Sequence, residues 1–230
     1  MIPLRDKNRS RTTPYVNYGI IGICLLVFLY ELALDDRLTA FIRHYAVDPV
    51  RVYAAVREQA IVVTALVPLV TSMFLHGGWL HLLGNMLYLF IFGDNVEDRL
   101  GHGMYLIFYL LCGIGSAIAQ VASNTGSSLP LLGASGAIAG VLGAYLILYP
   151  RARVLTLIPL GIIFPVVEVP AFFFLGFWFL IQFAQAALMG LNEPSGGGVA
   201  WWAHLGGFVI GAVLLPVFLL MNKIKSWVRP

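Results

Sequence analysis

Serine, histidine and asparagine side chains stand near the starts of three apolar segments, and these residue types together can cleave a peptide bond. Ser135 begins one apolar run, His204 lies at the start of another, and His81 and Asn85 lie in a third. A serine hydroxyl becomes a nucleophile when a base removes its proton, and a neutral histidine can do this near pH 7. Ser135 and His204 are therefore the candidate catalytic pair.

Peptide-bond cleavage by serine also needs hydrogen-bond donors, because the attacked carbonyl oxygen becomes negative. His81 and Asn85 are four residues apart and share one face of a helix. The small residues around Ser135 place it on the first helical turn, where backbone N–H groups are free. We expect the Ser135 N–H to act beside His81 and Asn85. Each residue alone is also typical of helix packing, and only the combination favours catalysis.

Other hydrolytic chemistries fit the sequence less well. Zinc peptidases carry His-Glu-x-x-His, whereas His76 and His81 are five apart with no glutamate between them. Every aspartate falls in a predicted loop or at the end of an apolar run, which argues against an aspartyl dyad. The apolar runs that carry Ser135 and His204 offer no acidic third member, so we predict a Ser–His dyad. We expect no metal and no cofactor.

The amino-acid composition indicates the environment in which this chemistry would occur. Of the 230 residues, 60% are apolar and only 11% are charged, whereas soluble domains carry about a quarter charged residues. We predict an all-α polytopic membrane protein whose residues 1–230 form a single domain in the lipid bilayer. The net charge of +3 comes from basic residues that flank apolar runs, so we expect no nucleic-acid partner. Cys24 and Cys112 lie inside apolar runs and are predicted to be packing residues.

The apolar runs are numerous enough to cross a bilayer several times. At about 20 residues per crossing, they predict six spans, at 15–34, 79–92, 103–122, 135–149, 171–191 and 203–221. The first run is also long enough for a signal peptide, but no small-x-small cleavage site leads into a polar mature start.

The segments between the spans are assigned by composition. Residues 1–14 and 222–230 are predicted to be cytoplasmic tails. Residues 35–78 are predicted to be a long outer loop with short amphipathic helices at the membrane surface, the alternative being a short extra span at 61–74. Three prolines and a glutamate make 154–170 an interfacial connection rather than a smooth helix.

The charge distribution sets the orientation of the spans. With both termini in the cytoplasm, every lysine and arginine lies on the cytoplasmic side except four in the long first loop: Arg37, Arg43, Arg51 and Arg57. The second, fourth and sixth spans then all run from outside to inside. His81 and Asn85, Ser135 and His204 are thereby predicted to lie at similar depth near the outer surface.

The ordered motifs resemble those of bacterial rhomboid proteases, which are intramembrane serine peptidases. The resemblance covers about residues 72–216. It rests on four motifs, namely His76-Gly-Gly-Trp-Leu-His81-Leu-Leu-Gly-Asn85, Glu97-Asp-Arg-Leu-Gly101, Gly133-Ala-Ser135-Gly136, and Ala203-His204-Leu-Gly-Gly207 with Gly211 beyond.

The resemblance implies a role for each matched residue. Ser135 would be the nucleophile, His204 its base, and His81 and Asn85 the oxyanion partners. The structural residues would be His76, Glu97, Gly133, Gly136, Gly207 and Gly211, with the last two letting the sixth helix pack tightly against the fourth.

The resemblance further implies a six-helix bundle in the bacterial cytoplasmic membrane that cuts single-span transmembrane proteins near their outer ends. The alternative is a non-catalytic relative that binds membrane helices, as derlins do, but the presence of both Ser135 and His204 favours the protease. The sequence departs from the family in two places. The first loop lacks a Trp-Arg pair, and Ala139 stands where some members carry an aromatic that stacks on the histidine. We expect Trp201 or Trp202 to position His204 instead.

Overall fold

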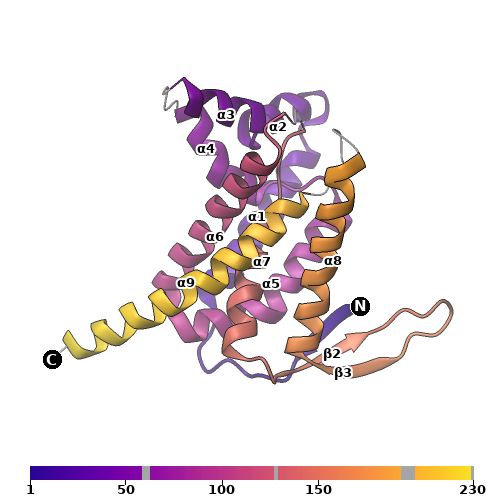
Figure 1. The fold of residues 1–230 in the computed structure, drawn as a ribbon, viewed down its shortest axis with the longest axis vertical. Coiled ribbons are helices and arrows are strands. Elements are labelled where there is room, and N and C mark those ends of the chain that lie inside the picture. The colour runs from indigo at the N-terminus through magenta and orange to yellow at the C-terminus, as the bar shows by residue number, and fades with distance from the viewer. Residues whose placement is uncertain (59–62, 127–128, 193–199, 229–230) are drawn as a thin grey trace.

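The computed structural model describes residues 1–58, 63–126, 129–192 and 200–228, and these are mostly helical (Figure 1). In chain order the elements are β1 Ile2–Asp6, α1 Tyr15–Leu32, a 3-10 turn Asp35–Arg37, α2 Leu38–Tyr45, α3 Pro49–Arg57, α4 Val63–Thr71, a 3-10 turn Ser72–Phe74, α5 Trp79–Leu100, α6 His102–Ser123, α7 Ser135–Leu148, β2 Arg153–Leu157, β3 Val166–Pro170, α8 Ala171–Asn192 and α9 Trp201–Val228.

Several helices are built to cross a membrane. Within the described residues, α1, α6, α8 and α9 are long and apolar enough to span one. The end of α4 and α5 form a pair bent by 89°, which makes a fifth candidate. Glycine and proline set the boundaries: α5 ends at Gly101, whose φ is +77°, and α8 follows Pro170. The chain is a multi-pass membrane protein.

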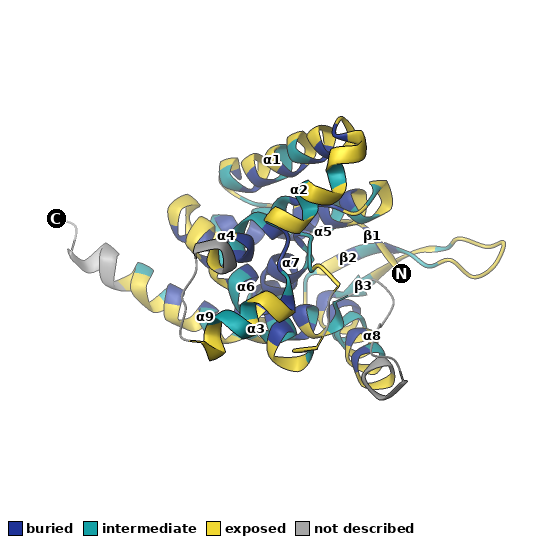
Figure 2. Ribbon diagram, turned by 90° about the horizontal axis from the view of Figure 1, so that it is seen from above, coloured by how far each residue is buried: buried dark blue, intermediate teal, exposed yellow. Residues whose placement is uncertain are grey.

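Helix α7 is the centre of the bundle, as the dark blue core in Figure 2 shows. All residues from 136 to 145 are buried, and α7 packs against α9, α6 and α5. At 14 residues it is about 21 Å long, less than the ~30 Å hydrocarbon layer. A helix enclosed by other helices needs no match to lipid thickness, because its neighbours provide the contact with lipid.

The all-α prediction omitted a small antiparallel sheet with strand order β1-β2-β3. The segment predicted to be a connection, 154–170, forms the hairpin of β2 and β3, in which Leu155 pairs with Glu168. Its prolines prevent a helix and its β-branched residues favour strands. The predicted N-terminal tail contributes β1, which pairs with β2, and Lys7 forms an ion pair with Glu168 at 2.5 Å.

Two predicted boundaries also differ from the structure. The second span was expected to end at Phe92, but α5 continues to Leu100. In its last turns, Asp98 and Glu97 accept hydrogen bonds from the backbone N–H groups of Thr12 and of Asn17 in α1. The predicted tail at 222–230 is helical as far as Val228, as part of α9. Between the predicted spans 171–191 and 203–221, residues 193–199 lie outside the described residues.

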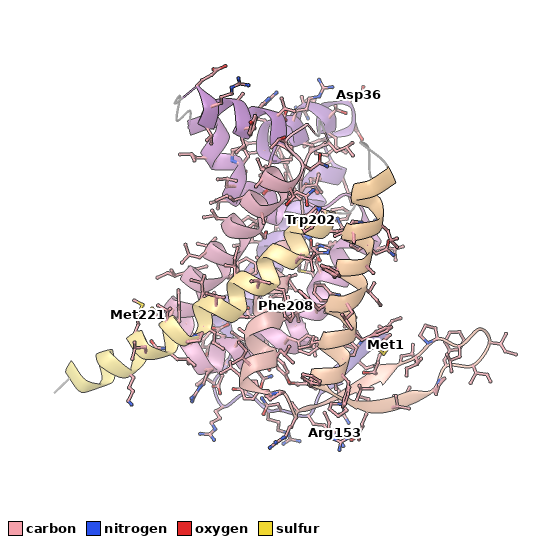
Figure 3. All side chains as sticks on the ribbon, in the orientation of Figure 1. Met1, Asp36, Arg153, Trp202, Phe208 and Met221 are labelled. Atoms are coloured by element: carbon pink, nitrogen blue, oxygen red, sulfur yellow. The ribbon has the colours of Figure 1, made fainter. Side chains whose placement is uncertain are left out.

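The segment 35–78 contains the short helices α2 and α3, as expected, and also the apolar helix α4, whose end belongs to the bent candidate span with α5. Figure 3 shows Asp36 of this loop at one end of the molecule and Met1 and Arg153 at the other. The loop helices and the β-sheet therefore cap opposite ends of the bundle (Figure 1).

Candidate active site

Ser135 and His204 meet although 69 positions separate them in the chain. Ser135 is the first residue of α7, and His204 lies in the first turn of α9. The His204 Nε2 atom is 2.7 Å from Ser135 Oγ, which is hydrogen-bond distance. This is the contact that a serine nucleophile and its base require.

The pair can meet because glycines allow α7 and α9 to approach backbone to backbone. A Cβ atom at Gly207 would lie 3.0 Å from the Gly136 carbonyl carbon and closer still to its oxygen. A Cβ at Gly211 would lie 2.5 Å from Gly140 Cα. Backbone atoms cannot move aside as flexible side chains can. The structural roles expected for Gly207 and Gly211 therefore have a direct physical basis.

The α-carbon of Gly136 faces α6, whereas its carbonyl group faces Gly207 of α9. A Cβ added there would lie 2.7 Å from the Cβ of Ser116, and 3.7 Å from the Ala203 carbonyl oxygen. Ser116 is itself fixed, since its hydroxyl donates to the Gly113 carbonyl at 2.8 Å. Only glycine lets the first turn of α7 fit between α6 and the start of α9.

His81 and Asn85 lie on α5 and face the turn that leads into Ser135. A Cβ at Gly133 would be 2.7 Å from His81 Nε2 and 3.7 Å from Asn85 Nδ2. Gly133 also has φ +120°, which side chains rarely adopt. Glycine is thus required both by the backbone and by the two polar side chains beside it.

The side-chain amide of Asn85 has an unused hydrogen-bond donor. Asn85 is 8% exposed, and its Nδ2 atom is buried with no hydrogen-bond acceptor among the described residues. Such orphaned donors are costly and call for an explanation. Nor does a side chain cap the N-terminus of α7, where Ser135 lies. The unpaired amide of Asn85 thus lies beside Gly133, in the turn that leads into Ser135.

His76 holds the approach to α5 in place. Its backbone N–H donates to both carboxyl oxygens of Glu31 at 3.3 Å, and its ring lies 5.3 Å from the His81 ring between centroids. Glu31 is a buried carboxylate of α1. These contacts fit the structural role expected for His76, because they fix the loop that precedes His81.

Glu97 is distant from the dyad and joins the opposite end of α5 to α1. The fully buried carboxylate accepts hydrogen bonds from the backbone N–H groups of Val16 at 3.0 Å and Asn17 at 2.7 Å, and contacts His102 Nδ1 at 2.5 Å. The first turn of α1 has free N–H groups and a positive dipole end. Glu97 therefore caps α1 from a different helix.

Sequence reasoning missed two residues of α8 that contact His204. The Gln182 Oε1 atom is 2.6 Å from His204 Nδ1, and the Trp178 ring lies 6.0 Å from the His204 ring. The expected contact with Trp201 is present, edge to face at 6.0 Å, while Trp202 is 37% exposed. A signal for Gln182 was available, because an amide inside an apolar span is itself a functional candidate.

The described residues contain no cluster of three or more His, Cys, Asp or Glu side chains able to hold a metal ion. The site thus consists of a hydroxyl, imidazoles and amides. Groups of these kinds can carry out nucleophilic acyl transfer.

Comparison with known proteins defines the class of protein. The family model of the Rhomboid domain matches residues 64–221, which is more than half of the chain. The chain therefore belongs to the rhomboid family.

Three relatives illustrate the range of the family. Rhomboid protein 1 of Saccharomyces cerevisiae mitochondria is 31% identical over 204 residues, 85% of this chain and 51% of the yeast protein. Two Bacillus subtilis proteins match shorter segments. Rhomboid protease GluP is 46% identical over 34% of this chain and 15% of its own length. The putative rhomboid protease YdcA is 38% identical over 34% of this chain and 39% of its own length. The chain spans about half or less of each. Similar proteins also come from plants and fish, so the bacterial branch is not singled out.

Proposed function

We propose that this chain is an intramembrane serine endopeptidase that cleaves transmembrane segments through the Ser135–His204 dyad. The observation that carries the proposal is the 2.7 Å contact between Ser135 Oγ and His204 Nε2. The orphaned Nδ2 atom of Asn85 supports it, because a catalytic site needs a donor that stays unpaired until the oxyanion forms.

The mechanism follows from these positions. Ser135 Oγ attacks the substrate carbonyl carbon while its proton passes to His204 Nε2. The oxyanion accepts hydrogen bonds from Asn85 Nδ2, the His81 ring and the Ser135 backbone N–H. The C–N bond then breaks, and His204 gives its proton to the leaving nitrogen. Water hydrolyses the acyl ester by the reverse sequence, and the proton returns to Ser135 Oγ.

Single-span membrane proteins are the proposed substrates. A transmembrane helix binds its own carbonyl groups in hydrogen bonds, so the scissile region must unwind before attack. Small, helix-breaking residues near the outer end of the substrate lower the cost of that unwinding.

The proposed topology has six spans, formed by α1 and by α5 to α9, with both termini in the cytoplasm of a bacterial cell. The β2–β3 hairpin then stays on the cytoplasmic side, and α7 and α9 run in the same direction. The arginines at 151 and 153 support this arrangement, because basic residues favour the cytoplasmic face.

Labelling and cleavage by matched serine variants test the proposal. A fluorophosphonate should label the wild type and Ser123→Ala, whose serine is exposed at the end of α6, but not Ser135→Ala. Ser135→Ala should also abolish cleavage of a model single-span substrate, with its thermal unfolding temperature in detergent unchanged. Cleavage by Ser135→Ala at near wild-type rate overturns the serine mechanism. A wild type that retains the substrate but neither cleaves it nor reacts favours the helix-binding alternative.

A further inference from the structure

The two ring nitrogens of His204 have different partners. Nε2 must carry a lone pair to accept the Ser135 proton, so the ring proton must reside on Nδ1. That proton has an acceptor, since Gln182 Oε1 lies 2.6 Å from Nδ1. Gln182 is only 7% exposed, so water does not compete freely for this contact.

A second contact from α8, the helix that carries Gln182, fixes the plane of the His204 ring. Trp178 precedes Gln182 by one turn of α8 and therefore lies on the same helix face. Its ring is inclined by 35° to that of His204, whereas the Trp201 ring meets the histidine edge-on at 89°. Position 139, on the α7 side, is a buried alanine and offers no ring to stack on His204. Gln182 and Trp178 of α8 provide the contacts that orient His204 instead.

We propose that Gln182 is a positioning residue that completes the Ser135–His204 pair, with an amide oxygen where soluble serine proteases place a carboxylate. This inference rests on the proposed function. In a Ser-His-Asp triad the acid orients the histidine and selects its tautomer. An amide oxygen can do both, because it accepts the Nδ1–H hydrogen bond and carries no charge.

The membrane setting favours an amide over an acid. A buried carboxylate loses its hydration, and charged groups inside spans are expensive. The neutral amide avoids that cost but stabilises the imidazolium less than a carboxylate would. Gln182 therefore acts through geometry, holding the lone pair of Nε2 toward Ser135 Oγ.

The contact can alternatively serve only to join α8 to α9. The two roles predict different measurements. A packing residue changes stability and leaves the reactivity of Ser135 toward a small probe unaltered. A positioning residue changes kcat and the rate of labelling by a fluorophosphonate, while the KM for a transmembrane substrate stays near its wild-type value.

The test uses the full-length protein and four variants on α8. Gln182→Leu and Gln182→Met remove the acceptor at similar volume, Gln182→Glu restores an acceptor oxygen, and Gln185→Leu makes the same change at a half-buried glutamine one turn further on. We expect Gln182→Leu and Gln182→Met to lower kcat and the labelling rate by roughly 10–100-fold, the range seen when an outer hydrogen-bond partner of a metal-binding histidine is removed. Gln182→Glu should recover most of the loss, and Gln185→Leu should behave as wild type.

Two results would overturn the inference about Gln182 without overturning the proposed function. One is a folded Gln182→Leu or Gln182→Met that labels at the wild-type rate. The other is a stable Gln182→Glu that reacts as slowly as the leucine variant. Either can occur while Ser135→Ala stays inactive and the proposed function stands. Cleavage that survives in Ser135→Ala would instead refute the proposed function, whatever the glutamine variants do.

Discussion

Gly207→Ala should separate the catalytic pair by adding a single methyl group. The new Cβ would lie 3.0 Å from the Gly136 carbonyl carbon and even closer to its oxygen. Both partners are backbone, so α9 must shift by about 1 Å to restore a normal C···O separation of ~3.3 Å. Since Gly136 follows Ser135 directly, that shift stretches the 2.7 Å contact between Ser135 Oγ and His204 Nε2 beyond hydrogen-bond distance.

We expect Gly207→Ala to lower the cleavage rate strongly and the free energy of unfolding moderately. A displacement of about 1 Å at reacting groups can cost on the order of 10²-fold in rate, and overpacking a close interface costs ~1–3 kcal/mol. The assay is cleavage of a single-span substrate in detergent and in vesicles, alongside thermal unfolding of the same samples.

The matched control is Gly22→Ala in α1, where an added Cβ has nothing within 4 Å. It should keep wild-type cleavage and unfold at the same or a slightly higher temperature, because alanine favours a helix over glycine. If Gly207→Ala cleaves as fast as Gly22→Ala, close contact between α7 and α9 does not position the pair and the reasoning fails.

Three further predictions address separate parts of the molecule. Asn85→Ala should lower kcat by roughly 10²–10³-fold with little change in KM; a change confined to KM would assign Asn85 to substrate binding. Burial, reinforced by the Asp94 charge, raises the pKa of Asp6 from 3.8 to about 6. The folded protein therefore binds this proton more tightly than the unfolded chain, and stability should rise as pH falls from about 6 toward 3.8; Asp6→Asn should lose that increment in thermal unfolding. In a cysteine-free background, Thr125→Cys should react with a membrane-impermeant thiol reagent in intact cells and Arg151→Cys only after lysis; the opposite pattern contradicts the six-span topology.

Most helices could be predicted because lipid imposes a simple rule on the sequence. An apolar run that crosses a bilayer must form a helix to satisfy its backbone, and glycine or proline then sets its ends. The sheet could not be found in this way. Strand β1 contains a proline and two charged residues, and its partner β2 lies about 150 positions away. A pairing so distant leaves no local pattern in the sequence.

Candidate site residues could be predicted where chemistry limits the choice of residue. The rule that polar groups inside spans are functional candidates led to Ser135, His204 and Asn85. The structure places Ser135 beside His204, and Asn85 beside the turn that precedes Ser135. The same rule applied to Gln182, but the search for a third member considered only acids. Trp178 had no comparable signal, because an aromatic residue in an apolar run is usually a packing residue.

The length of α7 sets the depth of the chemistry. Its C-terminal end is tied to the β-sheet, since the Tyr145 hydroxyl donates to Asp6 of β1 and Pro150 stops the helix. With the sheet at the cytoplasmic face, 14 residues reach about 21 Å into a ~30 Å layer. The proposed topology would then place Ser135 about 9 Å below the outer surface. The N-terminus of a helix that spans the whole layer would lie at the surface instead. In the proposed topology, a short central helix enclosed by longer ones would thus place the Ser135 hydroxyl below the outer surface of the bilayer.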